Sequence, residues 1–309
     1  MAIVKPESMN FSEKNIIMII AGTPGVGKTT IALSAPDVML IDADEGMARV
    51  NPAHRKDTAM CKTYEELLSD IQAAEGVYKT IVIDTGGALI DMLKDWAIRN
   101  DPKASKTSGG FSLQGFGIVK TEFLRLFAEL RKKFNVVLLF HESKEKADEG
   151  ITYELVCEGS ARNLVWQPAD LGAHMFIQNG ERYLGFSPTS QYSAKAAYGI
   201  KGLVKVPELK DGEPNMFLTK LFAQVKAALI AESASTKQHQ EDYEKAMETG
   251  RALIESVDAP EKALDVLNDI RKMAHALTSQ KELEAAFKRK MADNDWTYSA
   301  SEKRYVAKA

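Results

Sequence analysis

Residues 22–29 read GTPGVGKT, a full match to the pattern G-x-x-x-x-G-K-[ST]. The stretch before it, NIIMIIAG at 15–22, is apolar and predicts a buried strand, while KTTIALSAP at 28–36 predicts a helix. A glycine-rich turn between a strand and a helix lets backbone N–H groups and the helix N-terminus surround a phosphate. The sequence therefore predicts a phosphate-binding loop on an α/β fold.

The residues of this loop have separate expected tasks. Lys28 is expected to bring a positive charge to the β- and γ-phosphates, and the Thr29 hydroxyl is expected to bind Mg²⁺. ATP and Mg²⁺ are accordingly the expected cofactors. The residues expected to hold the nucleotide are Gly22, Thr23, Pro24, Gly25, Val26, Gly27, Lys28, Thr29 and Thr30.

The first half of the chain alternates apolar runs with amphipathic stretches. The runs are apolar on both faces, which is typical of parallel strands covered by helices. This alternation predicts an α/β domain with a mainly parallel sheet and right-handed crossovers. Further strands are expected at 38–44, 80–86 and 135–143, and helices at 64–77, 87–100 and 117–134. The strands are expected to end at Ala21, Asp44, Asp84 and His141.

Polar residues at these strand ends are candidate site residues, because open α/β sheets bind ligands at that edge. Asp84 is expected to orient Mg²⁺ through a water molecule. Asp44 and Glu45 are both candidates for the base that orients the attacking water. The longer side chain of Glu45 and the following Gly46 give it a slight preference, although the sequence does not exclude Asp44. His141 is a candidate contact to the γ-phosphate, and its alternative is a structural role.

Two lysine-bearing segments, 100–117 and 143–150, are candidate contacts to single-stranded DNA. Lysines bind the DNA backbone and exposed aromatic rings stack on bases, although solvated surface loops have the same composition. The candidates are Lys103, Lys106, Phe111, Lys144 and Lys146. A second set of cations, which could reach a neighbouring subunit's nucleotide, consists of Arg162, Lys195 and Lys201.

The rest of the chain predicts three further regions. A hairpin is expected within 173–188, where Asn179-Gly180 separates two β-rich runs. The α/β core is expected to cover 1–230, followed by a linker at 231–242, because AESASTKQHQ has no apolar periodicity. Residues 243–309 predict a helical region that ends in a small hairpin at 295–306.

Composition limits the class of protein. Hydrophobic residues make up 45% and charged residues 27%, which excludes wholesale disorder. The net charge of -3 excludes a strongly basic nucleic-acid coat protein, but it does not exclude local basic patches. No apolar run approaches the ~20 residues of a membrane span, and two cysteines without metal-ligand spacing favour a reduced compartment. We therefore expect a cytoplasmic protein.

The motif order GTPGVGKT, LIDADEG, TIVIDTGG and NVVLLFHESK resembles the RecA-like ATPases of bacteriophages over about 15–230. This group includes AAA-family ATP-binding proteins and the Sak-type single-strand annealing recombinases. The later segment QYSAKAAYGIKGL at 191–203 is similar to a lysine-bearing segment near that family's subunit interface. One departure concerns the base, since the family usually has Glu where Asp44 stands and Glu45 follows here.

The resemblance implies a RecA-like P-loop core that hydrolyses ATP, assembles as a ring or filament and acts in phage recombination in the host cytoplasm. Its implied partners are single-stranded DNA, further copies of the chain and a phage single-strand binding protein. Two alternatives remain open: a helicase or helicase-loader motor, and a nucleotide-gated interaction module with slow hydrolysis.

Overall fold

The computed structural model describes residues 11, 13–106, 110–147, 150–158, 160–209 and 213–308. The chain divides into two compact units, one formed by Glu13–Ala228 and one that contains the chain from Leu229 onward. Each unit is described by itself below.

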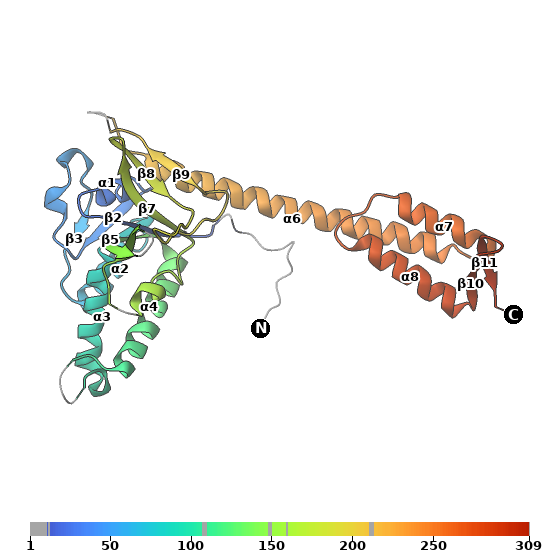
Figure 1. The fold of residues 1–309 in the computed structure, drawn as a ribbon, viewed down its shortest axis with the longest axis horizontal. Helices are drawn as coiled ribbons and strands as arrows, with labels where there is room; N and C mark the ends of the chain where they lie inside the picture. Colours follow the sequence, from blue (N-terminus) through green and yellow to red (C-terminus); the bar gives the residue numbers. More distant parts are fainter. Residues whose placement is uncertain are drawn as a thin grey trace. The chain divides into compact units, whose positions relative to one another are not determined.

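The first unit is built on a nine-stranded sheet (Figure 1). The strand order is β3-β2-β4-β5-β1-β7-β8-β9, and β6 pairs with the far part of β5. The strands from β3 to β7 in this order are parallel, whereas β6, β8 and β9 pair antiparallel with their neighbours. Their bounds are β1 Ile17–Gly22, β2 Val38–Asp42, β3 Thr58–Ala59, β4 Thr80–Asp84, β5 Asn135–Ala147, β6 Gly150–Leu155, β7 Leu171–Gln178, β8 Glu181–Gly185 and β9 Leu203–Val206.

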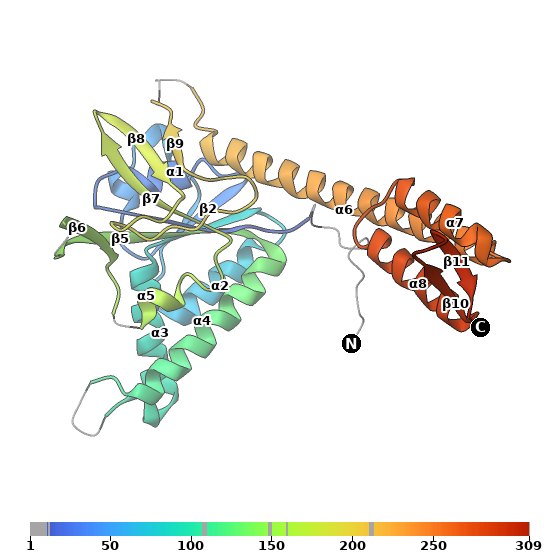
Figure 2. The ribbon, with the colours of Figure 1, turned by 45° about the vertical axis from the view of Figure 1, so that its right-hand side comes forward.

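Helices cover both faces of this sheet, as Figures 1 and 2 show. The helices α2 (Tyr64–Ala74), α3 (Gly86–Asn100) and α4 (Leu113–Lys133) lie on one face, and α1 (Lys28–Ala32) lies on the other. Every residue of β1, β2 and β4 is buried, as strands between two helical layers require. The predicted α/β fold with a mainly parallel sheet is therefore confirmed.

Three predicted boundaries within this unit are wrong. β2 ends at Asp42 rather than Asp44, and β5 continues past His141 because β6 supplies a partner for its second half. α4 begins at Leu113, inside the predicted loop 100–117, because the Ser112 hydroxyl caps it by accepting a hydrogen bond from Gly115 N. The hairpin expected around Asn179-Gly180 is present as β7 and β8, with positive φ at both turn residues.

An ionic cluster around the buried Asp170 holds the start of β1, at the opposite end of this strand from the glycine-rich loop. Asp170 accepts a hydrogen bond from Ile17 N at 3.0 Å, and its carboxylate also binds Lys14 and Arg131. Burial opposes ionisation of Asp170, but these bonds together hold its pKa below the usual value. The strand that carries the glycine-rich loop is thereby tied to α4.

The second unit contains the later part of α6 (Phe217–Glu255), α7 (Pro260–Lys272), α8 (Ser279–Asp293) and a hairpin of β10 (Trp296–Ser299) and β11 (Arg304–Ala307). Its core includes Ile270, Leu283 and Phe287. The small C-terminal hairpin that the sequence predicts is therefore present.

The predicted linker at 231–242 is helical rather than irregular, since α6 runs through it without a break. The segment contains Ala, Glu, Lys and Gln, which favour helix, and it contains no Gly or Pro. Side chains one turn apart bind each other, as in the bonds from Gln238 to Asp242 and from Gln240 to Glu244. A helix that is polar all round has no apolar stripe for a pattern search to find.

Among the helices of the described residues, none combines the length and apolarity needed to cross a membrane.

Candidate active site

The glycine-rich loop connects β1 to α1 with a backbone that side chains would obstruct. Gly25 and Gly27 have φ of +79° and +107°, which favour glycine. A Cβ atom added to Gly22 would lie 2.5 Å from the backbone oxygen of Met175 on β7. Glycine is therefore required by the backbone conformation at positions 25 and 27, and by the close approach of β7 at position 22.

Lys28 is buried at the base of this loop, with only 5% of its surface exposed. Its ammonium donates to the backbone oxygens of Gly22 at 2.9 Å and Thr23 at 3.1 Å, and lies 3.2 Å from His141 Nδ1. Burial lowers the Lys28 pKa to about 8, although the carboxylates nearby, Asp84 first, oppose the shift. A buried cation whose direct contacts are two backbone oxygens and an imidazole nitrogen fits an incoming polyphosphate, whose negative charge would compensate its own.

Thr29 and Asp84 form the second part of the site. The Thr29 hydroxyl donates to the Asp84 carboxylate at 2.6 Å, so the start of α1 lies beside the end of β4. Burial is the main reason why the Asp84 pKa is raised. Within the described residues, no group of three or more His, Cys, Asp or Glu side chains could hold a metal. The hydroxyl and carboxylate oxygens suit Mg²⁺, which commonly takes its other ligands from phosphates and water.

The two candidate bases lie in the turn after β2 and differ in their surroundings. Asp42, buried at the strand end, accepts hydrogen bonds from the backbone of Gly46 and Met47 at 2.8 Å each. Asp44 lies 3.5 Å from His141 Nε2, so it belongs to the cluster. Glu45 has φ +50°, and its side chain is 69% exposed and lies 3.8 Å from Lys62. The geometry therefore favours Asp44 over Glu45.

His141 joins the parts of this cluster. β5 lies between β1 and β4, so His141 stands between the glycine-rich loop and Asp84. One ring nitrogen faces Lys28 and the other faces Asp44. The cluster thus combines a phosphate-binding loop, a cation, a hydroxyl–carboxylate pair and a further carboxylate at one edge of the sheet.

Comparison with protein families matches residues 14–198 to the AAA domain. The chain belongs to the AAA domain family. This assignment supports nucleotide-binding ATPase activity for the cluster around Lys28. Comparison with curated proteins finds no match.

The AAA domain of this chain also contains site residues that were not predicted. Glu142, directly after His141, is buried and binds His174 Nδ1 at 2.6 Å. Arg182 on β8 donates from Nε to the backbone oxygen of Val26 in the glycine-rich loop at 3.0 Å. The position of Glu142 next to His141 could have identified it from the sequence. The position of Arg182 beside the loop depends on the register of a hairpin, which the sequence does not give.

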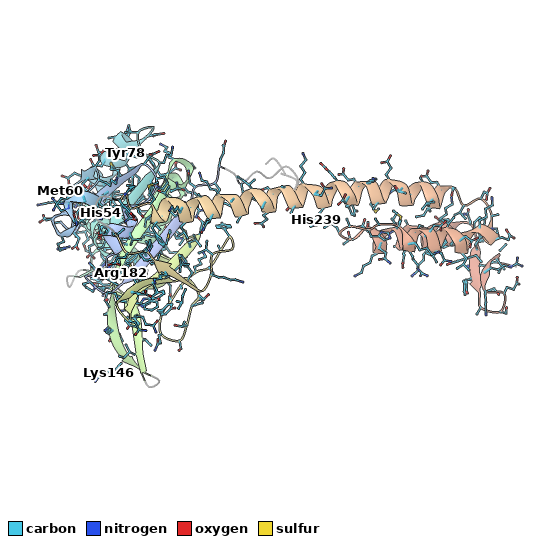
Figure 3. The ribbon with its side chains drawn as sticks, turned by 90° about the horizontal axis from the view of Figure 1, so that it is seen from above. His54, Met60, Tyr78, Lys146, Arg182 and His239 are labelled. Carbon is cyan, nitrogen blue, oxygen red and sulfur yellow. The ribbon has the colours of Figure 1, made fainter. Side chains whose placement is uncertain are left out.

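The candidate DNA residues fall into two separate places. Lys103 and Lys106 lie on the connection between α3 and α4, of which residues 107–109 are outside the described residues. Lys144 and Lys146 lie on the hairpin of β5 and β6, and Figure 3 shows Lys146 near its tip. Figure 2 shows this hairpin and the α3–α4 connection as distinct projections of the AAA domain. The four lysines are therefore not brought to one surface patch.

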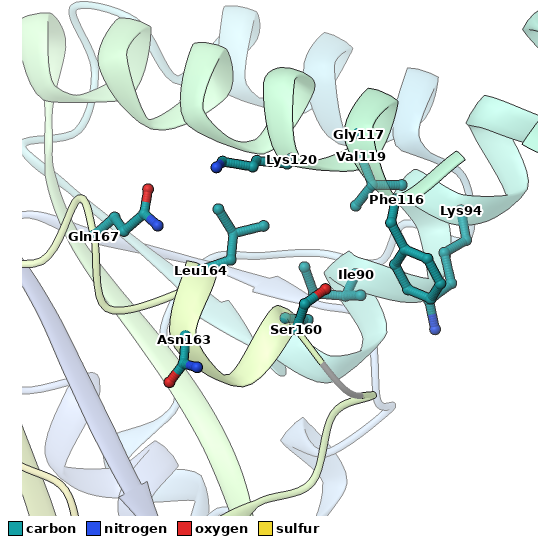
Figure 4. Close-up of a pocket in the computed structure, with 11 residues that line it drawn as sticks. Ile90, Lys94, Phe116, Gly117, Val119, Lys120, Ser160, Asn163, Leu164 and Gln167 are labelled. Carbon is teal, nitrogen blue, oxygen red and sulfur yellow. The ribbon is translucent and has the colours of Figure 1, made fainter. Parts of the chain in front are cut away.

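Phe111 is held by packing rather than presented as an open platform. It is half-buried against the core, and its ring lies edge-on to Phe116 at a centroid distance of 5.0 Å. A Cβ atom on Gly115 would lie 2.8 Å from the same ring. Phe116 in turn lines a pocket of about 230 Å³ bounded by α3, α4 and α5 (Ala161–Leu164), shown in Figure 4. None of the residues lining this pocket belongs to the cluster around Lys28.

The three cations expected to reach a neighbouring subunit differ in their environment. Arg162 binds Glu154, and Lys195 donates to the backbone oxygen of Ala169, so both have partners within the AAA domain. Lys201 is exposed. Their action on a neighbouring subunit stays a prediction.

Nucleotide binding is expected to weaken as the pH rises through the Lys28 pKa of about 8. Below that pH the ammonium is already charged, whereas above it each nucleotide must bring a proton to the deprotonated amine. The affinity should fall by up to about tenfold per pH unit above this pKa. Calorimetry in two buffers of different ionisation enthalpy should count close to one proton taken up per nucleotide near pH 9. Proton uptake near zero at both pH 7 and pH 9 would contradict this role of Lys28.

Proposed function

We propose that this chain is a phage-encoded, RecA-like ATPase that depends on Mg²⁺ and acts on single-stranded DNA in recombination or annealing. The observation that carries the ATPase part is the meeting of Lys28, Thr29, Asp84 and Asp44 at one edge of the sheet.

In this proposal the residues of the cluster have distinct tasks. The loop backbone and Lys28 bind the β- and γ-phosphates, and Thr29 and Asp84 hold Mg²⁺, which would neutralise phosphate charge when bound. Asp44 orients the attacking water, and His141 contacts the γ-phosphate. The link from His141 Nδ1 to Lys28 and from Nε2 to Asp44 supports a role that depends on the state of the nucleotide.

For the DNA part, the proposal favours the β5–β6 hairpin over the α3–α4 connection. Lys144 and Lys146 follow His141 on the same strand, and both are exposed without an acidic partner among the described residues. Tyr153 stands opposite Lys144 in register and is partly exposed. A pair of lysines beside a tyrosine suits the backbone and bases of single-stranded DNA.

Tyr153 also connects the β5–β6 hairpin to residues beside the cluster around Lys28. Its ring lies 4.6 Å from the His174 ring, and His174 binds Glu142, the neighbour of His141. DNA bound on the hairpin would therefore contact elements that share packing with the cluster around Lys28. This supports an ATPase whose turnover responds to DNA.

The DNA part is tested by two matched double variants, Lys144→Ala with Lys146→Ala, and Lys103→Ala with Lys106→Ala. The first is expected to bind a fluorescent single-stranded oligonucleotide more weakly and to lower the log–log salt slope by about 1.4, or ~0.7 per phosphate contact. The second, which removes the same charge elsewhere, should bind like wild type.

Equal affinity and equal salt slope for wild type and the β5–β6 variant would reject this DNA surface. Hydrolysis measured with and without single-stranded DNA separates the remaining alternatives. Turnover that no DNA changes would favour the nucleotide-gated interaction module, and stimulation by duplex or forked DNA would favour the helicase or loader motor. Assembly into a ring or filament, and contact with a phage single-strand binding protein, belong to the same proposal.

A further inference from the structure

Arg182 reaches the glycine-rich loop from an element outside the loop's own strand and helix. It stands on β8, opposite Ile177 of β7 and Val206 of β9. Its Nε atom donates to Val26 O at 3.0 Å, and a Cβ atom on Gly27 would lie 3.4 Å from the same nitrogen. The guanidinium is therefore packed against the loop of its own chain, and Figure 3 labels its position.

The charge of Arg182 is not neutralised within the described part of the chain. The side chain is exposed and forms no ion pair there. The adjacent carboxylate of Glu181 binds Lys205 and accepts a hydrogen bond from the Tyr183 hydroxyl. Since successive side chains of a strand point to opposite faces, Glu181 and Tyr183 lie across the sheet from Arg182.

We propose that Arg182 binds the phosphate groups of the nucleotide in the same chain, which rests on the proposed ATPase function. The bond to Val26 uses only the Nε donor, and a guanidinium has four further N–H donors on its two terminal nitrogens. These donors form a planar fork that matches phosphate oxygens. Arg182 thus adds a second cation to the site, beside Val26 and Gly27 of the loop.

Arg182→Gln separates phosphate binding from support of the loop. The Nε2 amide of glutamine sits at the same position along the side chain as Nε of arginine, so it can still donate to Val26 O. It lacks the charge and the two terminal nitrogens. Lys205→Gln is the matched control, because it removes one positive charge from the neighbouring strand on the opposite face.

Binding of ATP and of ADP is measured by titration calorimetry with Mg²⁺ at low and moderate salt. Arg182→Gln is expected to weaken both by about tenfold or more, the effect of losing a charge-assisted hydrogen bond, and the loss should shrink as salt rises. Lys205→Gln should stay within about twofold of wild type. Because Arg182 is exposed, the melting temperature of nucleotide-free Arg182→Gln should match that of wild type.

Three results would overturn the proposal: wild-type affinity in Arg182→Gln, an equal loss in Lys205→Gln, or a large drop in the melting temperature of Arg182→Gln. Normal binding in Arg182→Gln but weak binding in Arg182→Ala would show that the side chain only supports Val26. If wild type itself binds neither nucleotide, the proposed ATPase function fails rather than the role of Arg182.

Discussion

Lys28→Ala is expected to abolish ATP hydrolysis, with the rate falling by about a hundredfold or more. Lys28 is the cation buried at the base of the glycine-rich loop, where its ammonium can turn from the oxygens of Gly22 and Thr23 to a phosphate. Alanine leaves the β- and γ-phosphates without a charge at that point. Phosphate release, measured at saturating ATP and Mg²⁺, checks the result.

The loss in Lys28→Ala should not come from unfolding. Burial lowers the Lys28 pKa, so the folded protein holds the ammonium at a cost that alanine removes. The nucleotide-free variant is therefore expected to melt at or above the wild-type temperature. Lys120→Ala, which changes an exposed lysine of α4, is the control and should hydrolyse ATP normally. Wild-type turnover in Lys28→Ala would reject the phosphate loop.

Asp44→Asn is expected to slow hydrolysis by about 10²–10⁴-fold while nucleotide binding is retained. Asp44 lies 3.5 Å from His141, beside the lysine that faces the phosphates. An amide of the same shape cannot accept a proton from the attacking water. Single-turnover hydrolysis, measured together with ATP affinity, distinguishes the chemical step from binding.

Glu45→Gln provides the matched comparison, because the two carboxylates are adjacent in the sequence and differ in direction. Glu45 points toward Lys62 and solvent, so its variant should hydrolyse at close to the wild-type rate. The opposite ranking would restore the slight preference that the sequence gives to Glu45. Normal hydrolysis in both variants would mean that neither residue is the base.

The sheet and the glycine-rich loop could be predicted because their signals are local. A strand buried on both faces must be apolar throughout, and a tight phosphate loop needs glycine at fixed positions. The part of α6 at 231–242 could not be found in this way, since its stability comes from helix propensity and polar pairs rather than from an apolar stripe.

The site residues were harder to predict from the sequence, because their positions depend on backbone direction and strand register. The positive φ of Glu45 turns its side chain away from the cluster, and no pattern of residue types encodes that angle. Arg182 follows the turn residues of a hairpin, and only its pairing with Ile177 and Val206 sets the face on which it lies. The sequence predicts an exposed ring at Phe111 because it predicts a helix from residue 117, whereas α4 begins at Leu113.

The close approach of Gly22 to Met175 has a consequence for how this protein can diverge. A side chain at position 22 would overlap the backbone of β7, and no rotamer relieves a clash with a main-chain oxygen. Any larger residue at position 22 therefore requires β7 to move away. No single further substitution produces such a movement. Descendants of this sequence are expected to keep glycine at position 22 even if they lose catalysis. The constraint comes from the main-chain oxygen of residue 175, which any residue at that position would present.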